Sequence, residues 1–142
     1  MLQVNRAIAA RVALYDEDWQ GALDALDDSF LDLVPANNAE MNAGPVLAFG
    51  NDPDVSNPLF YPLDAATSTI LIVHPSLVED LLPGDTRGNK FYQRDVPVEA
   101  DDFPFTGEYQ DARWTSNTQS IPFIRNEELI LIYAEANARL AN

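Results

Sequence analysis

The chain of 142 residues is 46% hydrophobic and carries a formal charge of −15, with 23 acidic residues against 8 basic ones. This composition supports one domain with a hydrophobic core, and the charge argues against nucleic acid or an anionic membrane as a partner. The lack of cysteine excludes disulfides and zinc–thiolate sites, and the apolar runs are far shorter than the ~20 residues that cross a bilayer.

Residues 4–30 are expected to form two helices joined by a tight turn. Apolar side chains recur at helical spacing on both sides of the acidic run 16–18, and acids suit a turn and the start of the next helix. Trp19, followed three positions later by Ala22, matches one tetratricopeptide-type helix pair. Such units normally stack on neighbours, because one pair alone cannot bury both of its faces.

All ten prolines lie within residues 35–122, so the centre of the chain, 35–120, is expected to be irregular. Its β-branched run 69–73 predicts a short strand, and residues 75–82 predict a short helix that begins with a proline. Residues 90–98 predict a further strand, which Pro97 restricts to an edge or an end.

Residues 121–142 are expected to close the chain as a helix that is apolar on two faces. The two stripes consist of Leu129, Ile132 and Ala136, and of Ile130, Tyr133 and Ala134. Such a helix needs cover from several sides, which predicts a homodimer or a swapped pair of chains.

The expected fold is therefore mainly α and forms a single domain. It consists of a tetratricopeptide-like helical hairpin (1–34), a long irregular insertion with short strands (35–120) and a closing helix (121–142). No metal ion or cofactor is expected, since the lone His74 suits capping or packing, and Asp52 and Asp54 suit a solvated turn.

Three stretches resemble one protein family. "IPFIRNEELILIYAEANARLAN" resembles the R-x-x-E-x-x-L-x-x-A-E-A signature of SusD/RagB-type outer-membrane nutrient-binding lipoproteins. "AIAARVALYDEDWQGALDAL" resembles the helix pair that precedes it, and "HPSLVEDLLPGDTRG" resembles the short helix and D-x-R turn between them. The matching signature and turn residues are Arg125, Glu128, Leu131, Ala134, Glu135 and Ala136, and Asp85 and Arg87.

The resemblance implies a non-catalytic protein that binds an oligosaccharide at the bacterial cell surface, in the outer membrane, beside a SusC-like TonB-dependent porin. Family members are several times longer and carry a lipid on an N-terminal cysteine, so the chain is expected to be a central fragment. The motif residues are expected to be structural. Arg125 and Glu128 suit an ion pair along a helix, Asp85 and Arg87 suit a turn, and Glu135 belongs to the scaffold.

A sugar site needs aromatic faces for C–H groups and polar groups for hydroxyls. Residues 91–114 hold six of the fourteen aromatic residues, interleaved with acids. Trp114 is the leading candidate for stacking on a sugar, with Asn117 and Gln119 as amide partners. The further candidates are Tyr109, Tyr92 and Tyr61. The alternative for each ring is that it packs the long loop against the helices.

Two other functions remain open. A helical-repeat module would bind a polypeptide partner on its concave face. A glycosidase would need a matched pair of carboxyl groups in a cleft, and only the abundance of acids suggests one.

Overall fold

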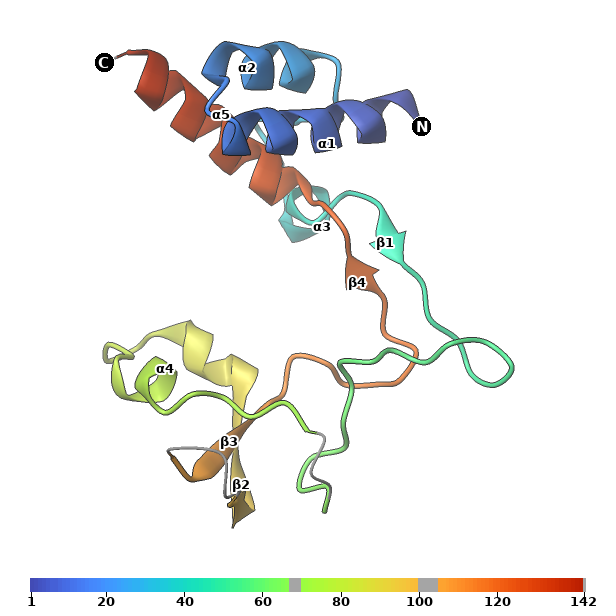
Figure 1. Ribbon diagram of the computed structural model, residues 1–142, viewed down its shortest axis with the longest axis vertical. Coiled ribbons are helices and arrows are strands. Elements are labelled where there is room, and N and C mark those ends of the chain that lie inside the picture. The colour runs from blue at the N-terminus through green and yellow to red at the C-terminus, as the bar shows by residue number, and fades with distance from the viewer. Residues whose placement is uncertain (67–69, 100–104, 142) are drawn as a thin grey trace. The chain divides into compact units, whose positions relative to one another are not determined.

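The computed structural model describes residues 1–66, 70–99 and 105–141 (Figure 1). Where one domain with an insertion at 35–120 was expected, two compact units are found. Unit 1 consists of Met1–Leu47 and Ile121–Asn142, and unit 2 consists of Ala48–Ser120.

The expected mainly α class with tetratricopeptide-like hairpins is wrong. The fold mixes α and β: 38% of it is helical and 14% is strand, in five helices and two small antiparallel sheets within the described ranges. Helical periodicity dominates both ends of the sequence, whereas the sheets join segments far apart in the chain, which local periodicity does not reveal. None of the described helices is long and apolar enough to cross a membrane.

Unit 1 is built on three helices, α1 (Leu2–Tyr15), α2 (Trp19–Asp27) and α5 (Asn126–Leu140), which pack against one another (Figure 1). The opening pair forms where the periodicity predicts it. Asp18 caps α2, because its carboxylate accepts a hydrogen bond of 2.9 Å from the Gly21 N–H.

The core of unit 1 combines small residues from α1 and α2 with larger residues from α2, from α5 and from the segment before α5. α1 and α2 contribute four buried alanines, which allow helices to approach closely. The larger buried side chains that fill the space beside them are Leu26, Ile124, Leu129 and Ile132.

Helix α5 fully buries one of its two apolar stripes: Leu129 is 0% exposed and Ile132 is 2% exposed. In the second stripe, Ile130 and Tyr133 are half-buried and Ala134 is exposed. Leu131, which lies outside both stripes, is 64% exposed. The expected helix at 121–142 begins later than predicted, because Ile121–Pro122 forms strand β4. The buried stripe packs on α1 and α2 of the same chain, and the homodimer stays a prediction.

A short sheet leads into α5. Strand β1 (Val46–Leu47) pairs with β4 in antiparallel register, and the small helix α3 (Asn38–Met41) precedes β1. Phe123 N–H donates to the Pro45 carbonyl at 2.9 Å and continues this pairing.

Unit 2 is organised around a β-hairpin. Strand β2 (Phe91–Val98) pairs with β3 (Gly107–Asp111), and the short helix α4 (Ser76–Glu79) and the 3₁₀ helix η1 (Thr86–Lys90) precede them. Strand β2 matches the strand predicted at 90–98, and α4 is shorter than the helix predicted at 75–82.

The strand predicted at 69–73 is reduced to a short bridge on the outer edge of β3. Val73 N–H donates to the Tyr109 carbonyl at 2.9 Å, and Asp111 N–H donates to the Leu71 carbonyl at 3.0 Å. Residue 69 lies outside the described residues.

The pairing register divides the hairpin into two faces. Phe91 lies opposite Asp111 and Gln93 lies opposite Tyr109, so these four side chains share one face. Tyr92 lies opposite Gln110, so that pair occupies the other face.

A buried polar cluster holds a loop on this second face. Arg94 donates through Nη1 to Gln110 Oε1 at 2.6 Å, through Nη2 to the Ala65 carbonyl at 3.1 Å and through Nε to the Val96 carbonyl at 3.0 Å. Gln110 Nε2 donates to the carbonyls of Tyr61 and Pro62. Both side chains are buried, so these hydrogen bonds replace water that neither group can reach.

Replacement of Leu129 by Ala should destabilise unit 1 by about 2–5 kcal/mol, because the cavity forms in a fully buried site. Leu131→Ala on the same helix is the matched control and should change stability by no more than about 0.5 kcal/mol. Urea unfolding followed by Trp19 fluorescence measures both. Equal effects of the two substitutions would contradict this placement of α5.

Replacement of Arg94 by Met should destabilise unit 2 by about 1–3 kcal/mol, because Gln110 Oε1 and two carbonyls lose their buried donor. Trp114 reports on unit 2 once Trp19 is replaced by Phe. The control is Lys90→Met, which removes an exposed cation that forms no ion pair in the described part of the chain. A stability of Arg94→Met equal to that of the control would show that the cluster does not hold the loop.

Candidate functional site

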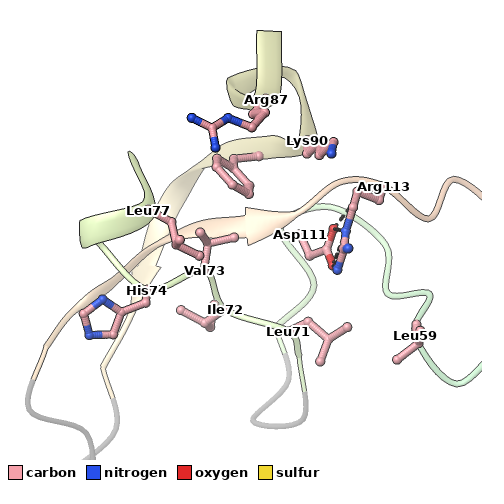
Figure 2. A pocket seen from close by; sticks show the side chains of 11 residues that line it. Leu59, Leu71, Ile72, Val73, His74, Leu77, Arg87, Lys90, Asp111 and Arg113 are labelled. Atoms are coloured by element: carbon pink, nitrogen blue, oxygen red, sulfur yellow. Dashed lines mark hydrogen bonds and ion pairs between the residues drawn. The ribbon is translucent and has the colours of Figure 1, made fainter. Parts of the chain in front are cut away.

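A cavity of about 640 Å³ opens on unit 2 and is lined by residues from several segments (Figure 2). Part of its lining is aliphatic and consists of Leu59, Leu71, Ile72, Val73 and Leu77. The aromatic ring of Phe91 and the polar side chains of His74, Arg87, Lys90, Asp111 and Arg113 complete it.

Backbone pairing brings these segments together. The register places Phe91 beside Asp111, and Ala112 N–H donates to the Lys90 carbonyl at 2.9 Å. The end of η1 therefore lies against the segment that follows β3. Because residues 71–73 pair with the other edge of β3, the aliphatic side chains come to the same region.

Two D-x-R turns place an arginine at the cavity. In the first, Asp85 Oδ1 accepts from the backbone N–H of Arg87 at 2.9 Å, and Arg87 Nη2 reaches Asp85 Oδ2 at 2.5 Å. In the second, the same two contacts between Asp111 and Arg113 measure 3.0 and 2.6 Å. The side chain thus doubles back on its own turn in both cases.

The carboxylates of these turns are shielded, whereas the guanidinium groups are open. The side chains of Asp85 and Asp111 are 14% and 8% exposed, and those of Arg87 and Arg113 are 68% and 54% exposed. Nη1 of each arginine makes no hydrogen bond to any described residue. Each turn therefore presents a fixed guanidinium with donors left for a ligand.

The ion pairs keep both carboxylates ionised. Hydrogen bonds from the side chain and backbone of Arg87 lower the pKa of Asp85 from 3.8 to about 2. Burial raises the pKa of Asp111, but hydrogen bonds from Arg113 outweigh burial, so the net shift is downward. The pKa values of Arg87 and Arg113 are raised chiefly by the same hydrogen bonds.

Lys90 and His74 complete the polar lining. The Lys90 side chain is exposed and forms no ion pair with any residue in the described ranges. His74 Nδ1 lies 2.9 Å from Ser76 Oγ, and its ring packs edge-on against Phe105 at 4.8 Å between centroids. His74 thus makes the capping and packing contacts that the sequence suggests for it.

The predicted sugar-binding tyrosines do not gather at the cavity. Tyr92 and Tyr109 lie on opposite faces of the hairpin, since neighbouring strand positions alternate. Tyr92 donates to Asp64 Oδ2 at 2.6 Å, a bond that raises the Tyr92 pKa. Tyr109 lines a separate cavity of about 400 Å³ with Glu79, Phe105 and Glu108 among its neighbours. Tyr61 contributes its carbonyl to the buried Gln110.

Trp114 lies next to the cavity in sequence without lining it. The guanidinium carbon of Arg113 is 5.9 Å from its ring centroid, and the ring is half-buried. Its Nε1 is buried and has no hydrogen-bond partner among the described residues. The expected amide partners are engaged elsewhere: Asn117 Nδ2 donates to Asn51 Oδ1 of another loop at 3.0 Å, and Gln119 Oε1 accepts from Thr115 N–H at 2.7 Å.

In unit 1 the motif residues hold the start of α5. The expected ion pair between Arg125 and Glu128 does not form, because Arg125 is the extended N-cap residue and helical spacing does not apply to it. Arg125 Nη2 pairs instead with Glu127 Oε2 at 2.9 Å. Glu128 accepts two hydrogen bonds from Arg11, at 2.5 and 2.8 Å, and so joins α5 to α1. Glu135 pairs with Arg139 along the helix.

No group of three His, Asp or Glu side chains in the described part of the chain is arranged to hold a metal ion. Asp52 and Asp54 lie in a turn that the hydrogen bond from Asp54 N–H to the Asn51 carbonyl closes at 2.8 Å.

The sequence carries a second signal for the cavity beside the "DTR" turn: "DAR" at 111–113 has the same D-x-R spacing, and no family motif points to it. Phe91 and Lys90 carry no comparable signal, because their role depends on strand register. Comparison with protein-family models, curated proteins and solved structures gave no match.

The Asp85 carboxyl group should titrate near pH 2 instead of 3.8. Because the folded pKa is lowered, its contribution to stability is complete above about pH 3.8 and disappears as the pH falls through about 2. Carbon-detected NMR of the carboxyl carbons measures the midpoint. Arg87→Gln should raise it toward 3.8, and Arg139→Gln, which removes an arginine of unit 1, should leave it unchanged. A wild-type midpoint near 3.8 would contradict the fixed turn.

Proposed function

We propose that the chain is a non-catalytic oligosaccharide-binding module and that the cavity of unit 2 holds the sugar. The observation that carries this proposal is the combination of an aromatic ring, an aliphatic wall and fixed guanidinium groups in one cavity of about 640 Å³. Ligand sites in proteins commonly occupy about 300–1,000 Å³ and place a few polar groups on a mainly apolar lining.

Each part of the lining suits one part of a pyranose. The ring of Phe91 and the side chains of Leu71 and Val73 offer apolar surface to the C–H face. The outward N–H groups of Arg87 and Arg113 donate to hydroxyl oxygens, and their turns hold them in place before the ligand arrives. Preorganised donors lower the entropic cost of binding.

The charge state of the acids supports binding without catalysis. Glycoside hydrolysis needs a carboxyl group with a raised pKa as the general acid. Asp111, the acidic residue that lines the cavity, has a lowered pKa, as does Asp85 behind Arg87. Neither group is suited to donate a proton near neutral pH.

The cellular setting is part of the same proposal and is supported by the resemblance of residues 125–136 to the SusD/RagB signature. We propose that the parent protein lies at the bacterial outer membrane and passes the oligosaccharide to a SusC-like TonB-dependent porin. The alternative of a stacked helical-repeat module is dropped, because it rests on the repeat fold that the mixed α and β architecture replaces.

Isothermal titration calorimetry with a panel of neutral and acidic oligosaccharides tests the binding function. Phe91→Leu keeps the apolar volume and removes the flat ring, so it should weaken binding by about tenfold, or about 1.4 kcal/mol. Phe123→Leu in unit 1 is the matched control and should bind as the wild type does. Absence of binding to every member of the panel would refute the proposal.

A further inference from the structure

Basic residues are concentrated at the cavity of an otherwise acidic chain. Three of the 8 basic residues, Arg87, Lys90 and Arg113, line it, whereas Asp111 is its one acidic lining residue within the described ranges. The fourth basic residue of unit 2, Arg94, is buried in the cluster on the other hairpin face. Every exposed cation of unit 2 therefore belongs to this cavity.

These cations are open to a ligand. The side chains of Arg87 and Arg113 are more than half exposed, and the carboxylates that pair with them are shielded behind them. Lys90 is exposed and pairs with no acid among the described residues. Asp85 and Asp111 thus orient the two guanidinium groups and leave their outer N–H groups unused.

The three cations line the same part of the cavity. Lys90 ends η1, which contains Arg87, and its carbonyl accepts from Ala112, the residue before Arg113. Figure 2 shows Arg87, Lys90 and Arg113 along one side of the cavity, with Leu71 and Ile72 on the other. A ligand in this cavity therefore meets cations on one side and apolar surface on the other.

We infer that the oligosaccharide is acidic and that a uronic-acid carboxylate binds between Lys90 and the arginine of a D-x-R turn. Guanidinium groups match a carboxylate through paired hydrogen bonds, and a lysine without a partner adds a compact charge. The chain's overall negative charge does not prevent this binding, because salt at about 0.1 M screens interactions between exposed charges that are more than roughly 10 Å apart. This inference rests on the proposed function and names its ligand class.

The experiment compares uronic-acid tetrasaccharides with their carboxyl-reduced counterparts, which differ only at C6. Galacturonate, glucuronate and mannuronate oligomers form the acidic panel, and calorimetry measures each pair. At least one acidic oligomer should bind at least about tenfold more tightly than its reduced form. Raised salt should weaken the acidic ligand selectively.

Lys90→Gln should remove most of this preference, so it should weaken binding of the acidic oligomer several-fold more than binding of the reduced oligomer. Arg139→Gln makes the same charge change in unit 1 and should preserve the preference. Thermal melting of both variants verifies that they fold. Acetate serves as a probe that tests whether the site binds any carboxylate without recognising the sugar.

The outcomes separate the two proposals. Equal affinity for acidic and reduced oligomers would refute the inference that the ligand is acidic, and the proposal of oligosaccharide binding would stand. Acetate binding as tightly as the oligomers would also overturn it, as would an unchanged preference in Lys90→Gln. Absence of binding to all acidic, reduced and neutral oligomers would overturn both.

Discussion

The hydrogen bonds of one buried arginine organise unit 2. Arg94 has three carbonyl or amide oxygens as partners, and Gln110 extends the same cluster to the carbonyls of Tyr61 and Pro62. A buried charge is costly unless its donors are satisfied, so the loop at 61–65 must stay on this face of the hairpin. Asp64 adds to the arrangement, because it accepts from Tyr92 and from the backbone of Asp95. The opposite face is thereby left for the cavity.

Strand alternation explains why the cavity is lined by Phe91 and not by its neighbour Tyr92, whereas Tyr109 shares the face of Phe91 and Asp111 but lines the separate cavity of about 400 Å³. Residues that are neighbours in sequence point to opposite sides of a hairpin, so Tyr92 belongs to the polar cluster while Phe91 belongs to the cavity. One aromatic-rich stretch therefore supplies a ring to the cavity and a ring to the polar cluster on the opposite face. The number of aromatic residues along 91–114 does not distinguish rings that line the cavity from rings that pack elsewhere.

Local signals in the sequence predict the three long helices, but not the short helices α3 and η1. Periodicity located α1 and α2, the acidic run supplied the Asp18 cap, and the proline at position 122 lies just before α5 begins. The pairing of β1 with β4 and of β2 with β3 could not be predicted, because it depends on contacts between distant segments. The same limit hid the cavity, which joins 71–74, 87–91 and 111–113. The partner of Glu128 was also missed, because Arg11 lies more than a hundred positions away.

Net charge describes the whole chain, whereas a ligand meets only the groups within a screening length. At −15, the chain repels an extended polyanion, whose many charges would have to pass over acidic surface. A short ligand with its charge inside the cavity meets Lys90 and the two open guanidinium groups instead. Asp85 and Asp111 neutralise much of the charge of the two arginines, so Lys90 supplies the net positive charge and the guanidinium groups supply free N–H donors. The acidic surface and the basic cavity are thus compatible, and together they favour a small acidic ligand over a long one.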